Sequence, residues 1–575
     1  MPAEGVVTEK TVRTRVMVGL VLIGSVCFLV GFLLALWPFQ SSVREGALVR
    51  GVACGAPVHA VGLADTAAAL ERLSRLPRDE SGVAPSSDDL ARLVRLERRA
   101  TEFRACQRPA AGRMSVAGVL EVAGVALVLT AFLVGRRHAP FERGPTDEPT
   151  VLGGNATGVG RGLTVRRWDL ALLIALAVTV RTGYNLAFLS DYLPVSDADH
   201  YNGIARNIAA GRGFSHPFPF PDPVPQATAF RPPLYPILLG VAYWVFGQHL
   251  FVAQALNVVL GTGAVLLVAL VANRFVGRQG ALVAGILAAM HPSLLANDGP
   301  PLSEPIGLVL LLGTILALRL GSTTWAGFTT GLLILTRPSA QGFAIVVAVW
   351  VLWRLGVRRA IRFGVVVALV VAPWVVRNWV ELGSPVLVTS NGFNLAALYS
   401  TASVEQGRWL DPVFDERLAG TRRGATDEVE LDRRFRDEAL RSIRRGPFEV
   451  VKVSLQNALD LVEVPPYRQQ AAEISDGRNL SLRYLTLPMV WSVIIVGTLG
   501  LWSIRRTRGV GPLVISAVYF FLITLPFSPG APRLRAPVDV VLCVGVGAAW
   551  AAHREGRSTP GGEAAVELQD GLSPA

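Results

Sequence analysis

The sequence contains little charge and lacks the patterns of a nucleic-acid-binding protein. Asp, Glu, Lys and Arg make up 17% of its 575 residues, compared with about 25% in soluble domains. Basic patches interleaved with aromatic residues are absent, as is zinc-finger spacing, so the formal net charge of +12 does not indicate nucleic acid as a partner. An ordinary soluble enzyme and a nucleic-acid-binding protein are both excluded as first interpretations.

Histidine and cysteine are also scarce, with seven and four residues respectively. No pair of histidines has the H-x-x-x-H spacing of a metal site, so His200, His249 and His291 receive no assigned role. The prediction is no metal site, with a divalent ion as an open alternative.

The four cysteines fall into two kinds of environment. Cys27 and Cys543 lie inside apolar blocks and are expected to be inert. Cys54 and Cys106 flank a polar segment that we place outside the membrane, where a disulfide between them could persist. The first apolar block, Val16 to Leu36, is too long for a typical signal peptide and lacks its small-residue exit, so we expect it to be a membrane helix.

Long apolar blocks dominate what is present. Hydrophobic residues make up 51% of the chain, and the mean hydropathy is +0.43. About 20 apolar residues are needed for a helix to cross the bilayer. Blocks of that kind lie at about 16–38, 115–135, 169–189, 250–273, 279–297, 302–320, 339–354, 360–377, 486–504, 510–527 and 537–552, with a shorter one at 325–336. The sequence therefore predicts an all-α polytopic membrane protein with about twelve transmembrane helices.

Arginine clusters between the blocks predict the topology. Cytoplasmic ends of membrane helices are enriched in Lys and Arg. Starting with Lys10, Arg13 and Arg15 inside, alternation places five further clusters inside: Arg136–Arg137, Arg166–Arg167, Arg274–Arg278, Arg358–Arg362 and Arg505–Arg508. Both termini are then cytoplasmic. The Ala/Val/Arg/Gly-rich composition is typical of a high-GC bacterium, so the expected location is a bacterial plasma membrane.

This topology divides the chain into six regions. We expect an N-terminal two-span hairpin at 1–137 with an extracytoplasmic insert at 40–113, a cytoplasmic linker at 138–167, a transmembrane core at 168–382 with an outer loop at 190–249, an extracytoplasmic helical segment at 383–484, C-terminal transmembrane helices at 485–553, and a disordered cytoplasmic tail at 554–575. Leu90, Leu93 and Leu96 among charges indicate a helical insert. Periodicity from Glu428 to Val462 indicates helices broken at Pro447.

An acidic turn opens the outer loop at 190–249. Ser196-Asp197-Ala198-Asp199-His200-Tyr201 can begin a helix that runs to Ala209, with Ser196 as its cap. The two acids could simply complement the helix dipole. However, Asp197 and Tyr201 share one face at i, i+4, and apolar residues follow, so the helix can lie on the membrane surface. A carboxylate in such a place could act as a general base toward a hydroxyl, with Tyr201 positioning the helix.

Several arginines fall at outer ends of the predicted spans, where the topology rule disfavours them. They are Arg231, Arg337, Arg377, Arg533 and Arg535. A guanidinium binds phosphate through charge-assisted, often bidentate hydrogen bonds, so a lipid phosphate at the outer interface would explain them. The alternative is that each reaches toward anionic headgroups. Arg181 lies within a predicted span and requires a partner inside the bundle.

Five short motifs occur in a fixed order around these residues. They are Arg231-Pro232-Pro233-Leu234-Tyr235-Pro236, Leu302-Ser303-Glu304-Pro305, Leu335-Thr336-Arg337-Pro338, Ala372-Pro373-Trp374-Val375-Val376-Arg377-Asn378 and Pro532-Arg533-Leu534-Arg535-Ala536-Pro537. Together with the Asp197-x-x-x-Tyr201 helix, they resemble the membrane glycosyltransferases of the GT-C fold, in the protein-mannosyltransferase and aminoarabinose-transferase branch. The resemblance covers roughly Trp168 to Trp550 and departs from the family at Leu534, where Tyr is usual.

The resemblance implies a GT-C-type helical bundle with surface-lying helices in its first catalytic outer loop, and an inverting sugar transfer. The donor would be a polyprenyl-phosphate sugar, and Asp197 the catalytic acid of that loop. Asp199 is a second candidate, and Glu304 matches a further family acid, although it could also be only a helix-start residue before Pro305. Tyr235 and the outer arginines would bind substrate, with Arg377 and Arg533 as the preferred groups at the departing phosphate. The acceptor, whether glycan, lipid or protein, stays open, and no other cofactor is implied.

Two other functions stay open. A transporter or flippase of lipid-linked sugars also needs outer arginines, but it predicts matched repeats and helices broken near mid-membrane. The Asp197 loop has no repeat in the second half of the chain, which favours the enzyme. A non-catalytic scaffold for cell-envelope assembly is the third interpretation. A phosphate leaving group on a lipid also explains why the sequence has no Gly-rich nucleotide-binding loop.

Overall fold

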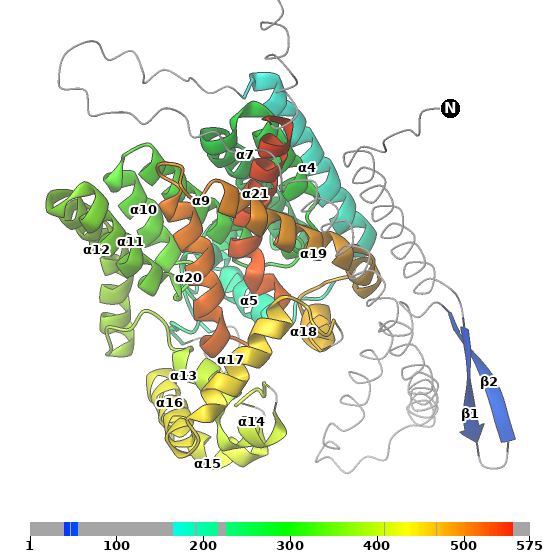
Figure 1. The fold of residues 1–575 in the computed structure, drawn as a ribbon. Coiled ribbons are helices and arrows are strands. Elements are labelled where there is room, and N and C mark those ends of the chain that lie inside the picture. Colours follow the sequence, from blue (N-terminus) through cyan, green and yellow to red (C-terminus); the bar gives the residue numbers. More distant parts are fainter. Residues whose placement is uncertain are drawn as a thin grey trace, which may run out of the picture. The chain divides into compact units, whose positions relative to one another are not determined.

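A computed structural model describes residues 39–45, 48–55, 165–189, 192–216, 226–407, 409–413, 415–466 and 468–555. In this part of the chain, five helical segments are long and apolar enough to cross a membrane. They are α4 (Arg167–Phe188), α7 (Leu250–Met290), α12 (Val357–Leu382), α19 (Leu480–Ser503) and the segment Pro532–Arg554, formed by the 3-10 helix η2 (Pro532–Arg535) and α21 (Ala536–Glu555). The predicted helical, multi-pass membrane protein is confirmed, whereas the number twelve stays a prediction (Figure 1).

The longest helix, α7, is in fact two helices. Its 41 residues would extend about 60 Å as one rod, twice the hydrocarbon thickness. Gly277 interrupts it with a φ of 69°, a value that glycine adopts without steric cost. A Cβ added at Gly285 would lie 3.2 Å from Cβ of Ala269, so the two halves pack side by side. The two separate blocks predicted at 250–273 and 279–297 correspond to these halves.

Shorter apolar helices complete the bundle. These are α6 (Leu234–Phe246), α9 (Glu304–Arg319), α10 (Thr323–Ile334), α11 (Ala340–Leu355) and α20 (Gly511–Phe527). Small residues allow close packing between helices: a Cβ at Gly500 of α19 would lie 1.7 Å from the carbonyl oxygen of Gly545 of α21. Association of membrane helices depends on such close backbone approach, because burial of apolar surface gains little within lipid.

The remaining helices gather at one end of the bundle. Helix α5 (Asp197–Ala209) packs against α6, and α8 (Pro292–Asn297) precedes the turn that leads into α9. Figure 1 shows five of the others together in the lower part of the view: α13 (Asn391–Tyr399), α14 (Thr401–Gln406), α15 (Ala419–Arg422), α16 (Glu428–Arg445) and α17 (Phe448–Leu461). The 3-10 helix η1 (Glu416–Leu418) precedes α15, and α18 (Gln470–Ser475) follows α17. Pro447 separates α16 from α17, as its ring predicts.

A two-stranded antiparallel hairpin, β1 (Phe39–Glu45) and β2 (Leu48–Gly55), was not foreseen. It lies at the start of the insert that the leucine spacing predicts to be helical. Several β-branched valines occur in these strands, and such residues favour extended backbone. The leucines at 90, 93 and 96 lie outside the described residues, and so does the expected Cys54–Cys106 bridge, since Cys106 and the side chain of Cys54 are not described.

Candidate active site

Asp197 lies at the start of α5 between two arginines that are far from it in sequence. Its Oδ1 accepts a hydrogen bond from Nη2 of Arg231, and its Oδ2 accepts one from Nη2 of Arg533. Arg231 precedes α6, and Arg533 belongs to η2, so three separate elements meet at one carboxylate. All three side chains are largely buried. The structure thus brings together three residues that the sequence predicts for the site.

The turn before Asp197 carries backbone strain. Ser196 has a φ of 55°, a left-handed value that costs a non-glycine residue about 1–2 kcal/mol. Its side chain makes no capping hydrogen bond, so the predicted role of Ser196 as a side-chain cap is wrong. Strained backbone of this kind persists where surrounding contacts hold it, often at functional sites. The two ion pairs of Asp197 supply such contacts.

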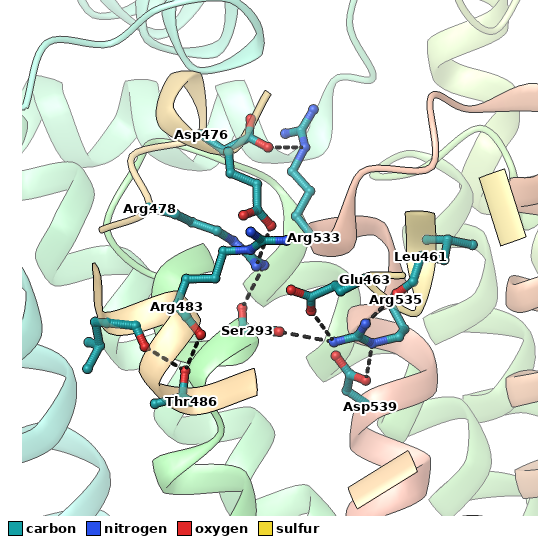
Figure 2. A network of polar contacts seen from close by, with 12 residues as sticks. Ser293, Leu461, Glu463, Asp476, Arg478, Arg483, Thr486, Arg533, Arg535 and Asp539 are labelled. Atoms are coloured by element: carbon teal, nitrogen blue, oxygen red, sulfur yellow. Dashed lines mark hydrogen bonds and ion pairs between the residues drawn. The ribbon is translucent and has the colours of Figure 1, made fainter. Parts of the chain in front are cut away.

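Arg533 is shared by three carboxylates. Besides the bond to Asp197, its Nη1 lies 3.6 Å from Oε1 of Glu304, and its Nε lies 3.0 Å from Oδ2 of Asp476. Arg337 approaches the same Glu304 oxygen at 3.9 Å. Three guanidinium groups and three carboxylates therefore form one charge-balanced cluster, which we call the acid–arginine cluster: Asp197, Glu304, Asp476, Arg231, Arg337 and Arg533. Asp476 is its one member that the sequence motifs do not include. Figure 2 shows the ion pair between Asp476 and Arg533.

Two carboxyl groups of this cluster, Asp197 and Asp476, have pKa values shifted in opposite directions. Burial disfavours the charge of Asp197, but the positive charges of Arg231 and Arg533 outweigh it and hold the pKa of Asp197 well below its usual range. Burial raises the pKa of Asp476 to about 7, with the charge of Arg533 opposing the rise and the charges of Asp197 and Glu304 adding to it. Asp197 is thus ionised but weakly basic while both arginines hold it.

The raised pKa of Asp476 predicts a pH-dependent stability. Asp in an unfolded chain has a pKa near 3.9, so between that value and about 7 the folded state holds a proton that the unfolded state has lost. Stability contributed by this group falls as pH rises through that window. An Asp476→Asn variant is therefore expected to have a higher Tm than wild type at pH 8, with the difference narrowing toward pH 5.

Thermal unfolding in detergent at the two pH values measures this effect. Asp437→Asn, the same change at an exposed position of α16, is the control and should match wild type at both. A difference in Tm between Asp476→Asn and wild type that is equal at pH 5 and pH 8 would contradict the raised pKa of Asp476.

His200 also belongs to the site, although its spacing predicts no role. Its Nδ1 lies 2.8 Å from Nη2 of Arg231. Because a guanidinium can only donate, Nδ1 accepts and the ring proton resides on Nε2. Burial, together with the charge of Arg231, lowers the pKa of His200 to about 3. A neutral imidazole, packed edge-on against Phe230 at 5.0 Å, thus helps to hold Arg231.

The two tyrosines predicted for the site, Tyr201 and Tyr235, pack against each other. Tyr201 makes a hydrogen bond of 3.2 Å to Oγ of Ser303, next to Glu304, and the guanidinium of Arg231 lies 5.6 Å from its ring centre. Tyr235 packs edge-on against Tyr201 at 5.4 Å and is fully buried. Tyr201 thus connects α5 to the residue before Glu304, whereas Tyr235 is buried behind it.

Asp199 lies apart from the acid–arginine cluster. It makes no ion pair within 4 Å among the described residues, and burial raises its pKa, opposed by the charge of Arg206. The i, i+2 spacing from Asp197 turns its side chain to another part of the helix surface. Of the two acids in the first turn, the geometry favours Asp197.

Arg377 and Arg535 are occupied by protein groups. Arg377 donates to the carbonyl oxygens of Phe214 and Thr228 at 2.8 and 2.7 Å. Arg535 is buried and pairs with Glu463 and Asp539, and it also donates to the carbonyl oxygen of Leu461 (Figure 2). Neither side chain is free to bind a substrate in this arrangement. Arg377 secures the loop that leads to Arg231, and Arg535 secures the turn that carries Arg533.

Arg181 finds the buried partner that its place in a membrane span requires. Its Nε lies 2.5 Å from Oδ2 of Asp298, and its other nitrogens donate to the carbonyl oxygens of Ala288 and Ala289. Asp298 begins the turn that leads to Glu304. The ion pair thus connects the membrane helix α4 to the turn that leads to Glu304.

Glu428, at the start of α16, braces the loop before Arg231. Its carboxylate accepts hydrogen bonds from the backbone N of Ala229 at 2.6 Å, and from the hydroxyls of Thr228 and Thr389 at 2.7 and 2.9 Å. A glutamine there would turn an amide NH₂ toward one of these donors, and a lost hydrogen bond to a charged group costs about 1.5–3 kcal/mol. We expect Glu428→Gln to speed amide exchange at Ala229 and Phe230 by roughly 10- to 100-fold.

Hydrogen-exchange mass spectrometry of the peptide covering residues 226–233 tests this brace. Glu438→Gln, on the same helix, serves as the control because it weakens only solvent-exposed contacts, with Arg441 and with Thr401. Unchanged exchange in Glu428→Gln would show that the loop is held by other contacts.

No group of three His, Cys, Asp or Glu side chains that could hold a metal ion occurs in the described residues. In the acid–arginine cluster, Arg533 takes the place between the three carboxylates that a cation would otherwise occupy.

Solved structures resemble this fold. The archaeal oligosaccharyltransferase AglB from Archaeoglobus fulgidus, in complex with an inhibitory peptide and a dolichol-phosphate, is 18% identical with a TM-score of 0.42, covering 68% of this chain and 50% of that one. ArnT from Cupriavidus metallidurans, bound to undecaprenyl phosphate, is 15% identical with a TM-score of 0.28, covering 68% of this chain and 78% of that one. Both are glycosyltransferases of the GT-C fold, the fold that the motifs resemble.

These likenesses have clear limits. This chain spans about half the length of AglB. No protein-family model matches the sequence, and no curated protein matches it either. Identities below 25% and TM-scores below 0.5 do not assign a function, which must be inferred from the site.

Proposed function

We propose that this chain is an integral-membrane glycosyltransferase that moves a sugar from a polyprenyl-phosphate donor to an acceptor hydroxyl. The observation that carries the proposal is the placement of Asp197 between the guanidinium groups of Arg231 and Arg533. One acidic group can serve as a base, and two adjacent guanidinium groups can bind a phosphate. These are the two chemical parts that transfer from a lipid phosphate needs.

The arginines would bind the phosphate of the donor. Guanidinium groups form short, charge-assisted hydrogen bonds with phosphate oxygens, often in pairs. Negative charge grows on the phosphate as its bond to the sugar breaks, and groups already oriented toward that charge stabilise the transition state most. Arg533 lies in η2, which leads directly into the membrane helix α21, and Arg231 precedes the apolar helix α6. A phosphate attached to a membrane lipid would reach such a position.

Asp197 would act as general base. In the substrate-free arrangement both its oxygens are held by arginines, so it is weakly basic. When a phosphate takes hydrogen bonds from Arg533 and Arg231, Asp197 loses positive neighbours and its basicity rises. It then accepts the hydroxyl proton while the acceptor oxygen bonds to the anomeric carbon. The bond from that carbon to the phosphate oxygen breaks with inversion, and the lipid phosphate leaves with the electron pair. This sequence requires the donor to bind first.

The proposed sidedness rests on the distribution of arginines along the chain. Arg274, Arg278 and the cluster Arg358–Arg362 lie at the opposite ends of the membrane helices from Asp197 in chain topology, as cytoplasmic ends require. The acid–arginine cluster would then face the extracytoplasmic side of a bacterial plasma membrane, with both termini cytoplasmic. A donor made inside and flipped across the membrane supplies the energy, so no nucleotide site is needed.

Binding of a lipid phosphate is the first test. Purified protein in lipid nanodiscs should bind farnesyl phosphate but not farnesol, and Arg231→Met should weaken binding by roughly tenfold or more. Arg506→Met, which removes an exposed arginine from the loop after α19, is the control and should bind normally. Equal binding of farnesyl phosphate and farnesol by wild type would overturn the proposed donor.

A further inference from the structure

Helix α17 carries a row of large apolar side chains that face away from the protein. Phe448, Val451, Leu455 and Leu459 are exposed by 84%, 65%, 63% and 42% of their surfaces. Successive residues of an α-helix are about 100° apart, so these four lie within an arc of about 80°. Four exposed large hydrophobic residues in one row form a patch that monomeric proteins rarely leave in water.

The opposite face of α17 is the one that packs. Asn457, Asp460 and Leu461 are buried and are centred about 170° from the exposed row. Asn457 donates to the carbonyl oxygens of Leu525 and Ser528, each at 2.7 Å, at the end of α20. The helix is therefore fixed by one side, and its apolar row is directed outward.

This attachment places the row next to surface that already faces lipid. Helix α20 exposes Val518, Leu522 and Phe527 along its length, as a membrane helix does. Phe527 is at the end to which α17 is bound. Figure 1 shows α17 at the lower end of α20, between that helix and α16. The helix that carries the row is thus fixed at the end of an apolar helix, close to the exposed Phe527.

Positive charge accompanies the row. Arg444 and Arg445 are exposed at the end of α16, immediately before α17. Lys452 is exposed beside the row, about 40° from Phe448 around the helix, and is paired with Glu449 at 3.3 Å, so the positive charge near the row that is unpaired among the described residues is that of the two arginines. Basic residues flanking an apolar stripe are typical of helices that lie in the membrane interface, with the basic groups near lipid phosphates.

We infer that α17 is an interfacial helix whose row Phe448, Val451, Leu455 and Leu459 is embedded among phospholipid acyl chains, with Arg444 and Arg445 at anionic headgroups. The occupant of this surface is the bilayer itself. The C-terminal end of α17 contacts the turn that carries Arg533, because Arg535 of that turn donates a hydrogen bond to the carbonyl oxygen of Leu461. The lipid surface is therefore coupled through α17 to the turn that carries Arg533. The inference does not depend on the glycosyltransferase activity.

Photo-crosslinking of the full native chain tests the inference without mutation. Protein in nanodiscs containing a phospholipid with a diazirine on its acyl chain is irradiated, and crosslinked residues are mapped by mass spectrometry. We expect crosslinks on the row of α17 at a level similar to the exposed face of α20. Helix α16, of similar length and with a polar exposed face, is the internal control and should be unlabelled. Labelling of α17 no higher than that of α16 would overturn the inference.

Two matched variants separate burial in lipid from general damage. Leu455→Asp should reduce crosslinking of α17 to the level of α16, while Gln456→Asp, one residue along and off the row, should leave it unchanged. Crosslinks on α20 report that the bundle is intact in both. The charge part is tested with nanodiscs of phosphatidylcholine alone or with phosphatidylglycerol: the anionic lipid should increase labelling of α17 in wild type but not in an Arg444→Gln, Arg445→Gln variant. Labelling of α17 that is equal with and without anionic lipid in wild type would overturn the headgroup role.

Discussion

An Asp197→Asn variant is expected to lose glycosyl transfer by about 10²- to 10⁴-fold, the usual contribution of a general base, while keeping its fold. Asn is nearly the same size, so the first turn of α5 can persist. The variant cannot accept a proton from the acceptor hydroxyl. It also leaves Arg231 and Arg533 without the carboxylate that they share, so both are freer to bind a phosphate. Affinity for farnesyl phosphate should therefore be retained or increased.

Loss of sugar transfer together with retained binding of farnesyl phosphate would distinguish a glycosyltransferase from a transporter. Transfer is measured with membranes that supply the lipid-linked donor, and binding with purified protein. Asp199→Asn is the matched control, since Asp199 lies outside the acid–arginine cluster, and it should keep most of its activity. A transporter of lipid-linked sugars would transfer no sugar to an acceptor, either in wild type or in the variants. Undiminished transfer by Asp197→Asn would rule out Asp197 as the base.

Arg533→Met is expected to have the second large effect, on both stability and donor binding. It removes the one positive group that contacts Asp197, Glu304 and Asp476 together, and breaking a buried ion pair typically costs about 3–5 kcal/mol. Donor affinity should fall at the same time, because the main phosphate-binding group is gone. The thermal unfolding temperature and farnesyl phosphate binding are the two measurements.

Two further variants distinguish binding from stability. Arg533→Lys keeps the charge but cannot reach three carboxylates or bind phosphate through two nitrogens, so it should recover much of the stability and little of the donor affinity. Arg535→Lys should show the reverse, since Arg535 is held entirely by protein groups. Full donor affinity in Arg533→Lys would contradict a bidentate role for Arg533.

Much of the fold could be predicted from the sequence, because a membrane restricts what the chain can do. Helices satisfy all their backbone hydrogen bonds internally, so long apolar blocks become membrane helices with few alternatives. The short helix at Asp197 and the break at Pro447 follow from equally local rules. The β1–β2 hairpin could not be predicted in this way, because in a polar insert strand pairing depends on which segments meet.

Part of the site was also accessible from sequence. Asp197, Arg231, Glu304, Arg337 and Arg533 stand in short motifs near the ends of apolar blocks, and the structure places them together. Arg377 and Arg535 stand in similar positions, yet bind protein groups. Sequence position alone does not separate these two roles, since an arginine at the outer end of a helix can reach a ligand or a neighbouring carbonyl.

Asp476, Glu428 and His200 could not be identified from the sequence. Asp476 and Glu428 lie in the segment after residue 383, which has many acids and no motif, and each acquires its importance from a partner far away in the chain. His200 stands beside Asp197 in the sequence, but no other histidine lies at metal-ligand spacing from it and no motif assigns it a role. A search for acids that precede or follow short helices in that segment would have included Asp476 among several equivalent candidates.

The proposed roles of Asp197 and the two arginines can be tested with a structure of the full chain in nanodiscs with bound polyprenyl phosphate. We expect phosphate oxygens within about 3 Å of nitrogens of both Arg231 and Arg533, with Asp197 released from Arg533. A phosphate bound elsewhere, or an Asp197 still held by both arginines in the presence of the lipid, would contradict these roles.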